Sequence, residues 1–357
     1  MTSSVVTPRE SALSVQSLSV SFVTDAGEVD AVTEVSFEVY PGEVLAVVGE
    51  SGSGKSVSVR SAIGLLPDTA RVDGHVVLGG QDVTTLNDKA WARLRGNKIS
   101  MVFQEPGSAL DPLFTIGYQI VEALRAHTRA DGKRMGSKDA KARAIELLTM
   151  VGLPNPEQRF SYYPHELSGG QKQRVMIAIA ISCEAKVIIA DEPTTALDVT
   201  VQRQVLQLLA GVRRDTDAAI LLISHDIAVV AQTCDRVLVM YAGRIVEDLP
   251  AAQLHTGAQH PYTRALLEVV PEIDADRDAP LKMIPGRPPA PGAFPTGCAF
   301  ADRCPFATAV CRERDPELAA VGTEHRVACW NPVTDDAPVA VATASDEVSV
   351  EDEKVLR

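Results

Sequence analysis

The chain has few aromatic residues, and it lacks both a membrane-spanning run and a secretory signal. Phe, Trp and Tyr make up 4% of its 357 residues. No stretch reaches the ~18 uninterrupted apolar residues of a spanning helix. The longest candidate, Val175–Ile181, is followed closely by Glu184 and Lys186, so it is expected to be a buried helix. The N-terminal segment carries Arg9 and Glu10 and has no apolar core, unlike a signal peptide. We therefore expect a cytoplasmic chain that reaches a membrane only through a partner subunit.

The chain also lacks an excess of basic charge and the context for disulfides. It has 34 Lys and Arg residues and 47 Asp and Glu residues, which give a formal net charge of −13. This balance argues against nucleic-acid binding as the main function. Six cysteines in a cytosolic chain do not suggest disulfides. Cys183 and Cys234 lie in apolar stretches and are interpreted as small buried hydrophobes.

A phosphate-binding loop is the clearest motif. Residues 49–56 match the pattern G-x-x-x-x-G-K-[ST]. Its glycines let backbone N–H groups surround a phosphate chain, Lys55 is expected to reach the β- and γ-phosphates, and Ser56 is expected to ligate Mg²⁺. The apolar run Val44–Val48 predicts a buried strand before the loop, and a helix is predicted from Lys55 to Leu66. The predicted phosphate-binding residues are Gly49, Glu50, Ser51, Gly52, Ser53, Gly54, Lys55 and Ser56.

Two carboxylates follow a second apolar strand. Asp191 and Glu192 come directly after the run 187–190. In open α/β sheets ligands bind at the carboxyl ends of the strands, which places this pair beside the phosphate loop. Asp191 is suited to hold Mg²⁺, usually through water, and Glu192 to orient and polarise the attacking water. In isolation, such a pair would be read as an exposed acidic strand end; the accompanying motifs favour the catalytic interpretation.

Strands and helices alternate along most of the chain. Strands are predicted over 13–23, 31–39, 99–103 and 219–223, with two more joined at residues 242–243 within 236–246, and helices over much of 110–182 and over 200–214. This order predicts an α/β fold with a mostly parallel sheet covered on both faces. Prolines gather between 285 and 295 in a linker-like stretch. Residues 331–357 hold seven acids, two bases and almost no large apolar residue, so they are predicted to form a disordered tail.

Residues 167–171, Leu-Ser-Gly-Gly-Gln, are the signature of ATP-binding cassette (ABC) ATPases, and with the phosphate loop they make the chain resemble that family. The resemblance implies an ABC-type nucleotide-binding domain with a P-loop core sheet, an antiparallel β subdomain and a helical subdomain at about 106–182. Gln104 matches the Q-loop. In the family this loop lies on the γ-phosphate side of the site, where Gln104 is expected to help bind Mg²⁺, and it faces the membrane subunits. Residues 196–198 match the D-loop.

Two further positions carry open alternatives. His225 matches the switch histidine that contacts the γ-phosphate; a lone histidine is more often structural, but its place directly after the strand 219–223 favours function. Phe22 matches the aromatic residue under the adenine ring, and it could equally be a core residue of its strand.

The signature also implies a dimer. Ser168, Gly169 and Gly170 open a helix near Gln171, and a helix N-terminus with small residues is a favourable anion site. In ABC proteins this surface completes the ATP site of a second cassette arranged head to tail. ATP binding then closes the dimer and hydrolysis opens it.

Three segments resemble the ATPases of dipeptide and oligopeptide importers, namely 103–113, 259–264 and 284–289. The resemblance is to the D-type subunit with a C-terminal cysteine extension. It implies two permease subunits, a second and different ATPase, an extracytoplasmic peptide-binding protein, and a place at the cytoplasmic face of the membrane. The segment His260–Tyr262 is interpreted only as a helix start with Pro261 in its first turn. Alternatives are the same importer type for nickel or another small solute, an exporter cassette, or a non-transport ABC ATPase.

Four cysteines near the C-terminus, Cys298, Cys304, Cys311 and Cys329, are separated by five, six and seventeen residues. Structural zinc sites normally use C-x₂₋₄-C spacing, which is absent, whereas iron–sulfur clusters tolerate wider loops. The family resemblance favours a [4Fe–4S] cluster, with zinc as the runner-up and unligated thiols as a third alternative. The expected organisation is a flexible N-terminus (1–11), an ABC ATPase domain (12–258), the extension (259–330) and the tail (331–357).

Overall fold

A computed structural model describes residues 9–25, 27–130, 135–194, 198–270, 282–334 and 342–343. A mixed eight-stranded sheet runs through its centre in the order β12-β13-β10-β9-β3-β8-β7-β6. The strands are β3 (Val44–Val48), β6 (Ile99–Val102), β7 (Val187–Asp191), β8 (Ala219–Ile223), β9 (Arg236–Tyr241), β10 (Arg244–Pro250), β12 (Ala319–Gly322) and β13 (His325–Val327). The five strands from β9 to β6 are parallel to one another, and the other pairings are antiparallel.

A second, antiparallel sheet packs against this core. Its order is β2-β1-β4-β5, formed by β1 (Leu13–Thr24), β2 (Gly27–Val39), β4 (Ala70–Leu78) and β5 (Gln81–Asp82). Its inward residues share one apolar cluster with α1 (Lys55–Ser61), α2 (Asp88–Leu94) and the core sheet. The predicted α/β fold with an antiparallel β subdomain is confirmed.

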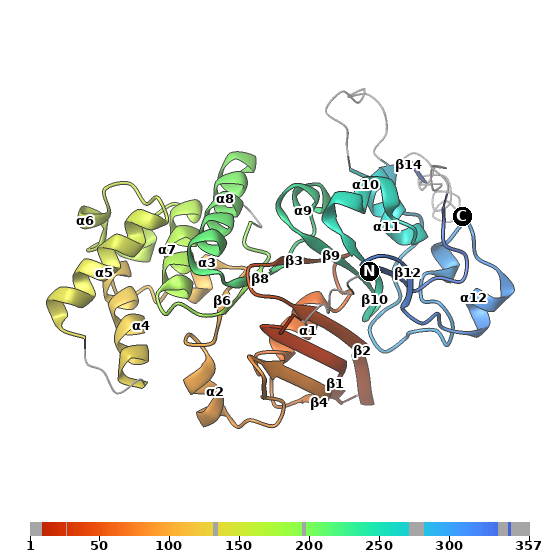
Figure 1. Ribbon diagram of the computed structural model, residues 1–357, viewed down its shortest axis with the longest axis horizontal. Helices are drawn as coiled ribbons and strands as arrows, with labels where there is room; N and C mark the ends of the chain where they lie inside the picture. Colours follow the sequence, from red (N-terminus) through yellow and green to blue (C-terminus); the bar gives the residue numbers. More distant parts are fainter. Residues whose placement is uncertain are drawn as a thin grey trace, which may run out of the picture.

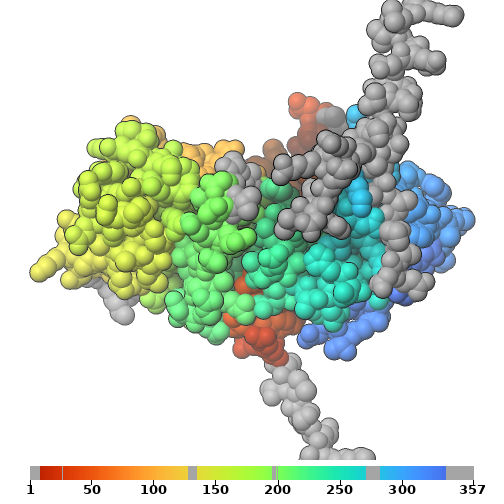
Figure 2. Space-filling model, turned by 90° about the horizontal axis from the view of Figure 1, so that it is seen from above, coloured from red at the N-terminus to blue at the C-terminus, as the bar shows by residue number. Residues whose placement is uncertain are grey.

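The central parallel strands are apolar because they are covered on both faces. Every residue of β3, β7 and β8 is buried, as expected for parallel strands between layers of other elements. A helical lobe at one end consists of α3 (Pro106–Ala109), α4 (Ile116–Ala130), α5 (Ser137–Met150), α6 (Pro156–Arg159), a 3₁₀ turn (Pro164–Glu166) and α7 (Gly169–Ile181). Figure 1 shows this lobe and the C-terminal extension at opposite ends of the core sheet, and Figure 2 shows the same arrangement from above.

Of the remaining helices, the first packs with the helical lobe, and the others lie toward the extension. In chain order, the remaining helices are α8 (Val199–Thr216), α9 (Ile227–Thr233), a 3₁₀ turn (Ala251–Gln253), α10 (Leu254–Gly257), α11 (Pro261–Glu268), a 3₁₀ turn (Ala301–Arg303) and α12 (Ala309–Glu313). α9, α10 and α11 share an apolar cluster with β9, β10 and Phe300. Since β13 pairs with β10, the extension continues the core sheet instead of forming a separate layer.

Three details differ from the sequence expectations. The helix after the phosphate loop was predicted to reach Leu66, but α1 ends at Ser61, because Gly64 adopts the left-handed conformation (φ +62°) and its N–H and that of Leu65 bond back to the last turn of the helix. The linker-like stretch is anchored to the domain, since Gly292 donates a backbone hydrogen bond to Asp30, although Pro288, Pro291 and Pro295 are exposed.

The predicted tail begins later than residue 331. Asn331 donates side-chain hydrogen bonds to the backbone oxygen of Phe306 and to Thr308. In addition, β14 (Ala342–Thr343) pairs with β11 (Lys282–Met283). The rest of the tail and the first eight residues lie outside the described residues, and the domain boundaries stay predictions. Within the described ranges, the helices are all too short or too polar to cross a membrane.

Candidate nucleotide site

The phosphate loop joins β3 to α1, as the sequence predicts. Gly49 adopts φ +150°, and a Cβ added there would lie 2.2 Å from the backbone oxygen of Met240, so no side chain fits. Lys55 is buried, and its Nζ donates to the backbone oxygens of Gly49 (2.8 Å) and Glu50 (2.9 Å). Burial lowers the pKa of Lys55, while the charges of Glu192, Asp191 and Glu50 oppose that shift. The ammonium group therefore lies inside the curve of the loop.

Ser56 and Asp191 form the oxygen pair expected for a magnesium site. The Ser56 hydroxyl donates to Asp191 Oδ1 at 2.8 Å. The carboxylate of Asp191 is fully buried at the end of β7, and its other oxygen accepts from Arg60 Nη2 at 2.9 Å and Nε at 3.2 Å. Hydroxyl and carboxylate oxygens beside a phosphate loop fit the hard-oxygen preference of Mg²⁺.

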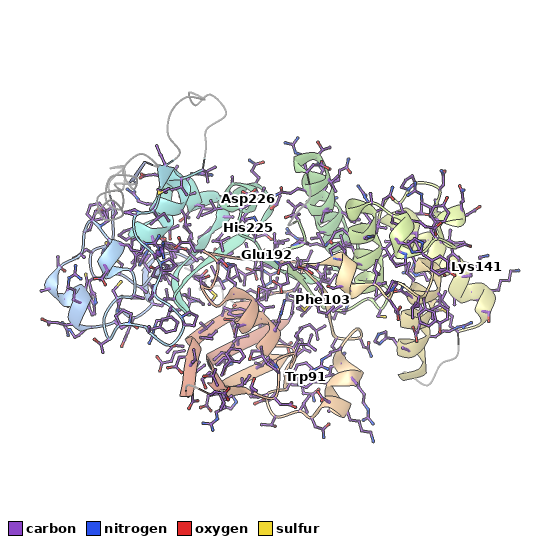
Figure 3. The ribbon with its side chains drawn as sticks, turned by 180° about the vertical axis from the view of Figure 1, so that it is seen from behind. Trp91, Phe103, Lys141, Glu192, His225 and Asp226 are labelled. Atoms are coloured by element: carbon purple, nitrogen blue, oxygen red, sulfur yellow. The ribbon has the colours of Figure 1, made fainter. Side chains whose placement is uncertain are left out.

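Glu192 is the meeting point of the predicted catalytic residues. Its Oε2 accepts from Gln104 Nε2 at 2.9 Å and lies 3.6 Å from His225 Nδ1. Glu192 has φ +47°, a conformation that non-glycine residues seldom adopt and that often marks functional sites. Figure 3 shows Glu192 and His225 near each other at the centre of the molecule. The fold thus brings together three residues that are far apart in the sequence.

The signature segment forms the start of a long helix. Ser168 caps α7, and its hydroxyl accepts from the backbone N–H of Gln171 at 3.4 Å while the Gln171 side chain accepts from the Ser168 N–H at 3.1 Å. Ser168 and Gly169 are exposed. A Cβ added at Gly170 would lie 2.7 Å from the Val201 side chain, so this position requires a glycine. The segment belongs to the helical lobe, whereas the phosphate loop belongs to the core sheet.

The structure places Phe22 and part of the D-loop. Phe22 is half-buried and packs on the apolar cluster of the antiparallel sheet, opposite Val29 and Ala70. Its predicted role under adenine stays a prediction. In the D-loop, residues 196 and 197 lie outside the described residues, whereas Asp198 caps α8 by accepting from the Val201 N–H at 3.0 Å.

The four C-terminal cysteines line one small cavity together with His260 and Phe300. Burial raises the pKa of Cys298 to about 11 and that of Cys329 to about 12. Cys311 Sγ accepts from Asn331 Nδ2 at 3.5 Å. Soft thiolate donors facing one cavity fit a metal group, which would supply the positive charge that buried thiolates need. However, within the described part of the chain, no three His, Cys, Asp or Glu side chains are grouped as single-ion ligands.

Three contributors to the site were missed by the sequence reasoning. Arg60 binds Asp191, and Arg303 and Tyr262 of the extension bind Glu50. Tyr262 belongs to the segment interpreted only as a helix start. No local pattern marks Arg303 as a partner of a residue 253 positions away.

The fold and these contacts define an ATP-binding cassette. A family model described as "ABC transporter" matches residues 32–195, and one described as "Oligopeptide/dipeptide transporter, C-terminal region" matches residues 246–311. The dipeptide transport ATP-binding protein DppD of Bacillus subtilis is 47% identical over 323 residues, covering 90% of this chain and 95% of that protein. The chain therefore belongs to the family of ATP-binding proteins of oligopeptide and dipeptide ABC transporters.

Other similar proteins agree in family and fold. The oligopeptide transport ATP-binding protein OppD of Mycobacterium tuberculosis is 49% identical over 317 residues, 89% of this chain and 51% of that protein. The chain thus spans about half the length of this relative. Among solved structures, the ATP-binding cassette MJ0796, a dimer in a post-hydrolysis state bound to ADP and Pi, aligns with a TM-score of 0.60 and 27% identity, covering 67% of this chain and 98% of that one.

Proposed function

We propose that the protein is the ATP-hydrolysing subunit of a peptide importer. The observation that carries this proposal is the convergence of Lys55, Asp191 and Glu192 at one end of the parallel strands, with Gln104 bonded to Glu192 at 2.9 Å. Family membership and the match of residues 246–311 to the oligopeptide/dipeptide transporter region support the transport context.

Each residue at the site has a role in phosphoryl transfer to water. Backbone N–H groups of the phosphate loop and Lys55 bind the β- and γ-phosphates, which are the groups that carry the developing charge. Ser56 and Asp191, with Gln104 near the γ-phosphate, hold Mg²⁺, which would neutralise phosphate charge when bound. Glu192 orients and polarises the attacking water, and His225 contacts the γ-phosphate. Phe22 stacks on the adenine.

The signature residues act on a second cassette. Ser168, Gly169 and Gly170 present a helix N-terminus on the surface, where it can bind the γ-phosphate held by a partner arranged head to tail. Gln171 keeps this end in place through the reciprocal bonds with Ser168. That the similar cassette MJ0796 is a dimer supports the pairing of two cassettes. In an importer the partner is a second, different ATPase subunit, so the working unit is a heterodimer.

Exposed apolar side chains on the segment from Phe103 to Tyr118 support coupling to permease subunits. Phe103, Leu113, Phe114 and Tyr118 are each at least 41% exposed, and the rings of Phe114 and Tyr118 stack with centroids 4.7 Å apart. Clustered large apolar side chains on a surface mark interaction sites. We assign this surface to two permease subunits, which hold the protein at the cytoplasmic face of the membrane and receive peptides from an extracytoplasmic binding protein. A nickel or other small-solute importer remains the second candidate for the substrate.

We further propose that Cys298, Cys304, Cys311 and Cys329 bind a [4Fe–4S] cluster. A single Zn²⁺ needs four sulfurs each about 2.3 Å from one point, and no such group occurs in the described ranges. A four-iron cluster separates its ligands more widely. The cavity between the thiols measures about 10 Å³, enough for the centre of roughly one water. Cluster binding therefore requires these thiols, most of them on loops, to move apart.

Reconstitution tests the whole assignment. The chain, a second ATPase subunit and two permeases are placed in vesicles with the peptide-binding protein outside, and phosphate release and uptake of labelled di- and oligopeptides are measured with ATP inside or absent. ATP-dependent peptide uptake supports the proposal. Uptake of Ni²⁺ without peptide uptake supports the second candidate, and ATP hydrolysis that no solute stimulates contradicts both.

A further inference from the structure

The residue that follows the first glycine of the phosphate loop, Glu50, is held by the C-terminal extension. Its backbone N–H donates to the Tyr262 hydroxyl at 2.8 Å. Its carboxylate accepts two hydrogen bonds from the Arg303 guanidinium, Nη1 to Oε2 at 2.7 Å and Nη2 to Oε1 at 3.1 Å. Such a paired geometry is strong and directional. The two partners of Glu50, Tyr262 and Arg303, both lie more than 200 positions from it in the sequence.

Contacts other than the one with Glu50 also hold the Arg303 side chain in place. Its side chain is only 5% exposed. Its Nε donates to the backbone oxygen of Pro285 at 2.8 Å, and Nη1 also donates to the Tyr241 hydroxyl at 3.2 Å. The guanidinium lies 5.8 Å from the ring centroids of Tyr241 and Phe300. A guanidinium with this many partners acts as a rigid support for the loop.

The same glutamate connects the extension to Lys55. Lys55 Nζ donates to the Glu50 backbone oxygen at 2.9 Å, while the Glu50 N–H is bound by Tyr262. A cavity of about 200 Å³ separates residues 50–53 from Pro288–Pro291, so the extension also lies along the outer side of the loop. The position and charge of Glu50 therefore affect the Lys55 ammonium group, which is expected to bind the phosphates.

We propose that Arg303 and Tyr262 are positioning residues for nucleotide binding, which hold the phosphate loop through Glu50 and neutralise its charge. This inference rests on the proposed ATP binding at residues 49–56. A bare carboxylate in this loop would repel the incoming triphosphate. Arg303 cancels that repulsion, and Tyr262 fixes the backbone from which the carboxylate projects. The extension is thereby a working part of this chain's own ATP site.

A double-mutant cycle on the full-length chain tests the inference. The variants are Arg303→Gln, Glu50→Gln and the double variant, and Arg312→Gln is the matched control, since Arg312 pairs with Asp302 within the same extension. Dissociation constants for MgATP and ADP are measured by calorimetry, and thermal unfolding is followed without nucleotide. We expect Arg303→Gln to weaken MgATP binding roughly tenfold through the unpaired charge, and ADP binding less because ADP carries less charge.

The decisive readout is non-additivity. Removing the carboxylate as well should restore much of the MgATP affinity, so the double variant binds more tightly than Arg303→Gln alone. Equal affinities for Arg303→Gln and Arg312→Gln, or no recovery in the double variant, would overturn the proposal, even if the melting temperature falls. If Arg303→Gln does not fold, Tyr262→Phe is tested in its place. Loss of the Tyr262 hydroxyl should weaken MgATP binding severalfold. An unchanged MgATP affinity would contradict the inference. Failure of the unaltered chain to bind ATP would instead refute the proposed function.

Discussion

Gln104 donates a hydrogen bond from its side-chain amide to the Glu192 carboxylate, 2.9 Å away. Gln104 follows β6 and leads into the helical lobe, whereas Glu192 follows β7 in the core sheet. This bond therefore joins the entry to the lobe to the residue assigned to the attacking water. A shift of the lobe that moves Gln104 would change the surroundings of Glu192, so the proposed permease contact could act on hydrolysis through this bond.

Glu192→Gln should separate ATP binding from hydrolysis. The amide keeps the size of the side chain but cannot polarise water, so we expect the turnover number to fall about 10²–10⁴-fold. Affinity for MgATP should stay within about twofold, because Lys55 and the loop still bind the phosphates. Phosphate release and nucleotide affinity are measured together. Glu184→Gln, at an exposed acid outside the site, is the control, and equal turnover in both variants would remove Glu192 from the mechanism.

If two copies of this chain pair with each other, two inactive variants should complement each other, whereas the proposed heterodimer with a second ATPase subunit would show no recovery. Ser168→Arg fills the helix N-terminus and should abolish hydrolysis in the partner's site while leaving nucleotide binding intact. Mixed with Glu192→Gln, it should recover about a quarter to a half of the normal activity, because one of the two composite sites in a mixed dimer has both intact parts. Ser161→Arg, an exposed serine in the same lobe, is the control. No recovery on mixing would argue against head-to-tail pairing of two copies.

Cys304→Ser should lower the metal content of the protein. Purified without oxygen, the unaltered chain is expected to contain about four irons and to absorb broadly in the visible range. Cys304→Ser should lose most of that iron, whereas Cys183→Ser, outside the cysteine cavity, should keep it. About one zinc per chain would favour the structural zinc alternative. Absence of any metal in the unaltered protein would leave the cavity as a cluster of free thiols.

His260 should make the fold sensitive to mild acid. Complete burial lowers its pKa to about 4, whereas an unfolded histidine has a pKa of about 6.5. Between these values the unfolded chain binds a proton that the folded chain does not, so stability is lost as the pH falls from 6.5 toward 4. At pH 5 this group should cost about 2 kcal/mol relative to pH 7.

His260→Asn is the matched variant for that prediction. The amide oxygen can still accept from the Tyr262 N–H, as His260 Nδ1 does at 3.1 Å. Urea unfolding at pH 7 and pH 5 should therefore show a smaller loss of stability in the variant. An identical loss in both proteins would show that other groups cause the acid sensitivity.

The local motifs were predictable because each consists of consecutive residues. The phosphate loop needs glycines and a lysine at fixed spacing, and β7 with its terminal carboxylates is a buried apolar run followed by two acids. The prediction of a helix through Leu66 was wrong because it overlooked Gly64, a local stop signal that ends the helix in the left-handed conformation. The linker interpretation of residues 285–295 likewise did not foresee the backbone hydrogen bond from Gly292 to Asp30.

The sequence by itself determined the fold class, the phosphate loop, the carboxylate pair and the family, because these depend on local spacing and hydrophobic pattern. Only the tertiary structure decided that Arg60 binds Asp191, that four separated cysteines line one cavity, and that Arg303 and Tyr262 hold Glu50. The physical reason is that such contacts form between side chains brought together by packing of the sheet, and a pairing across 253 positions leaves no periodic trace in the chain.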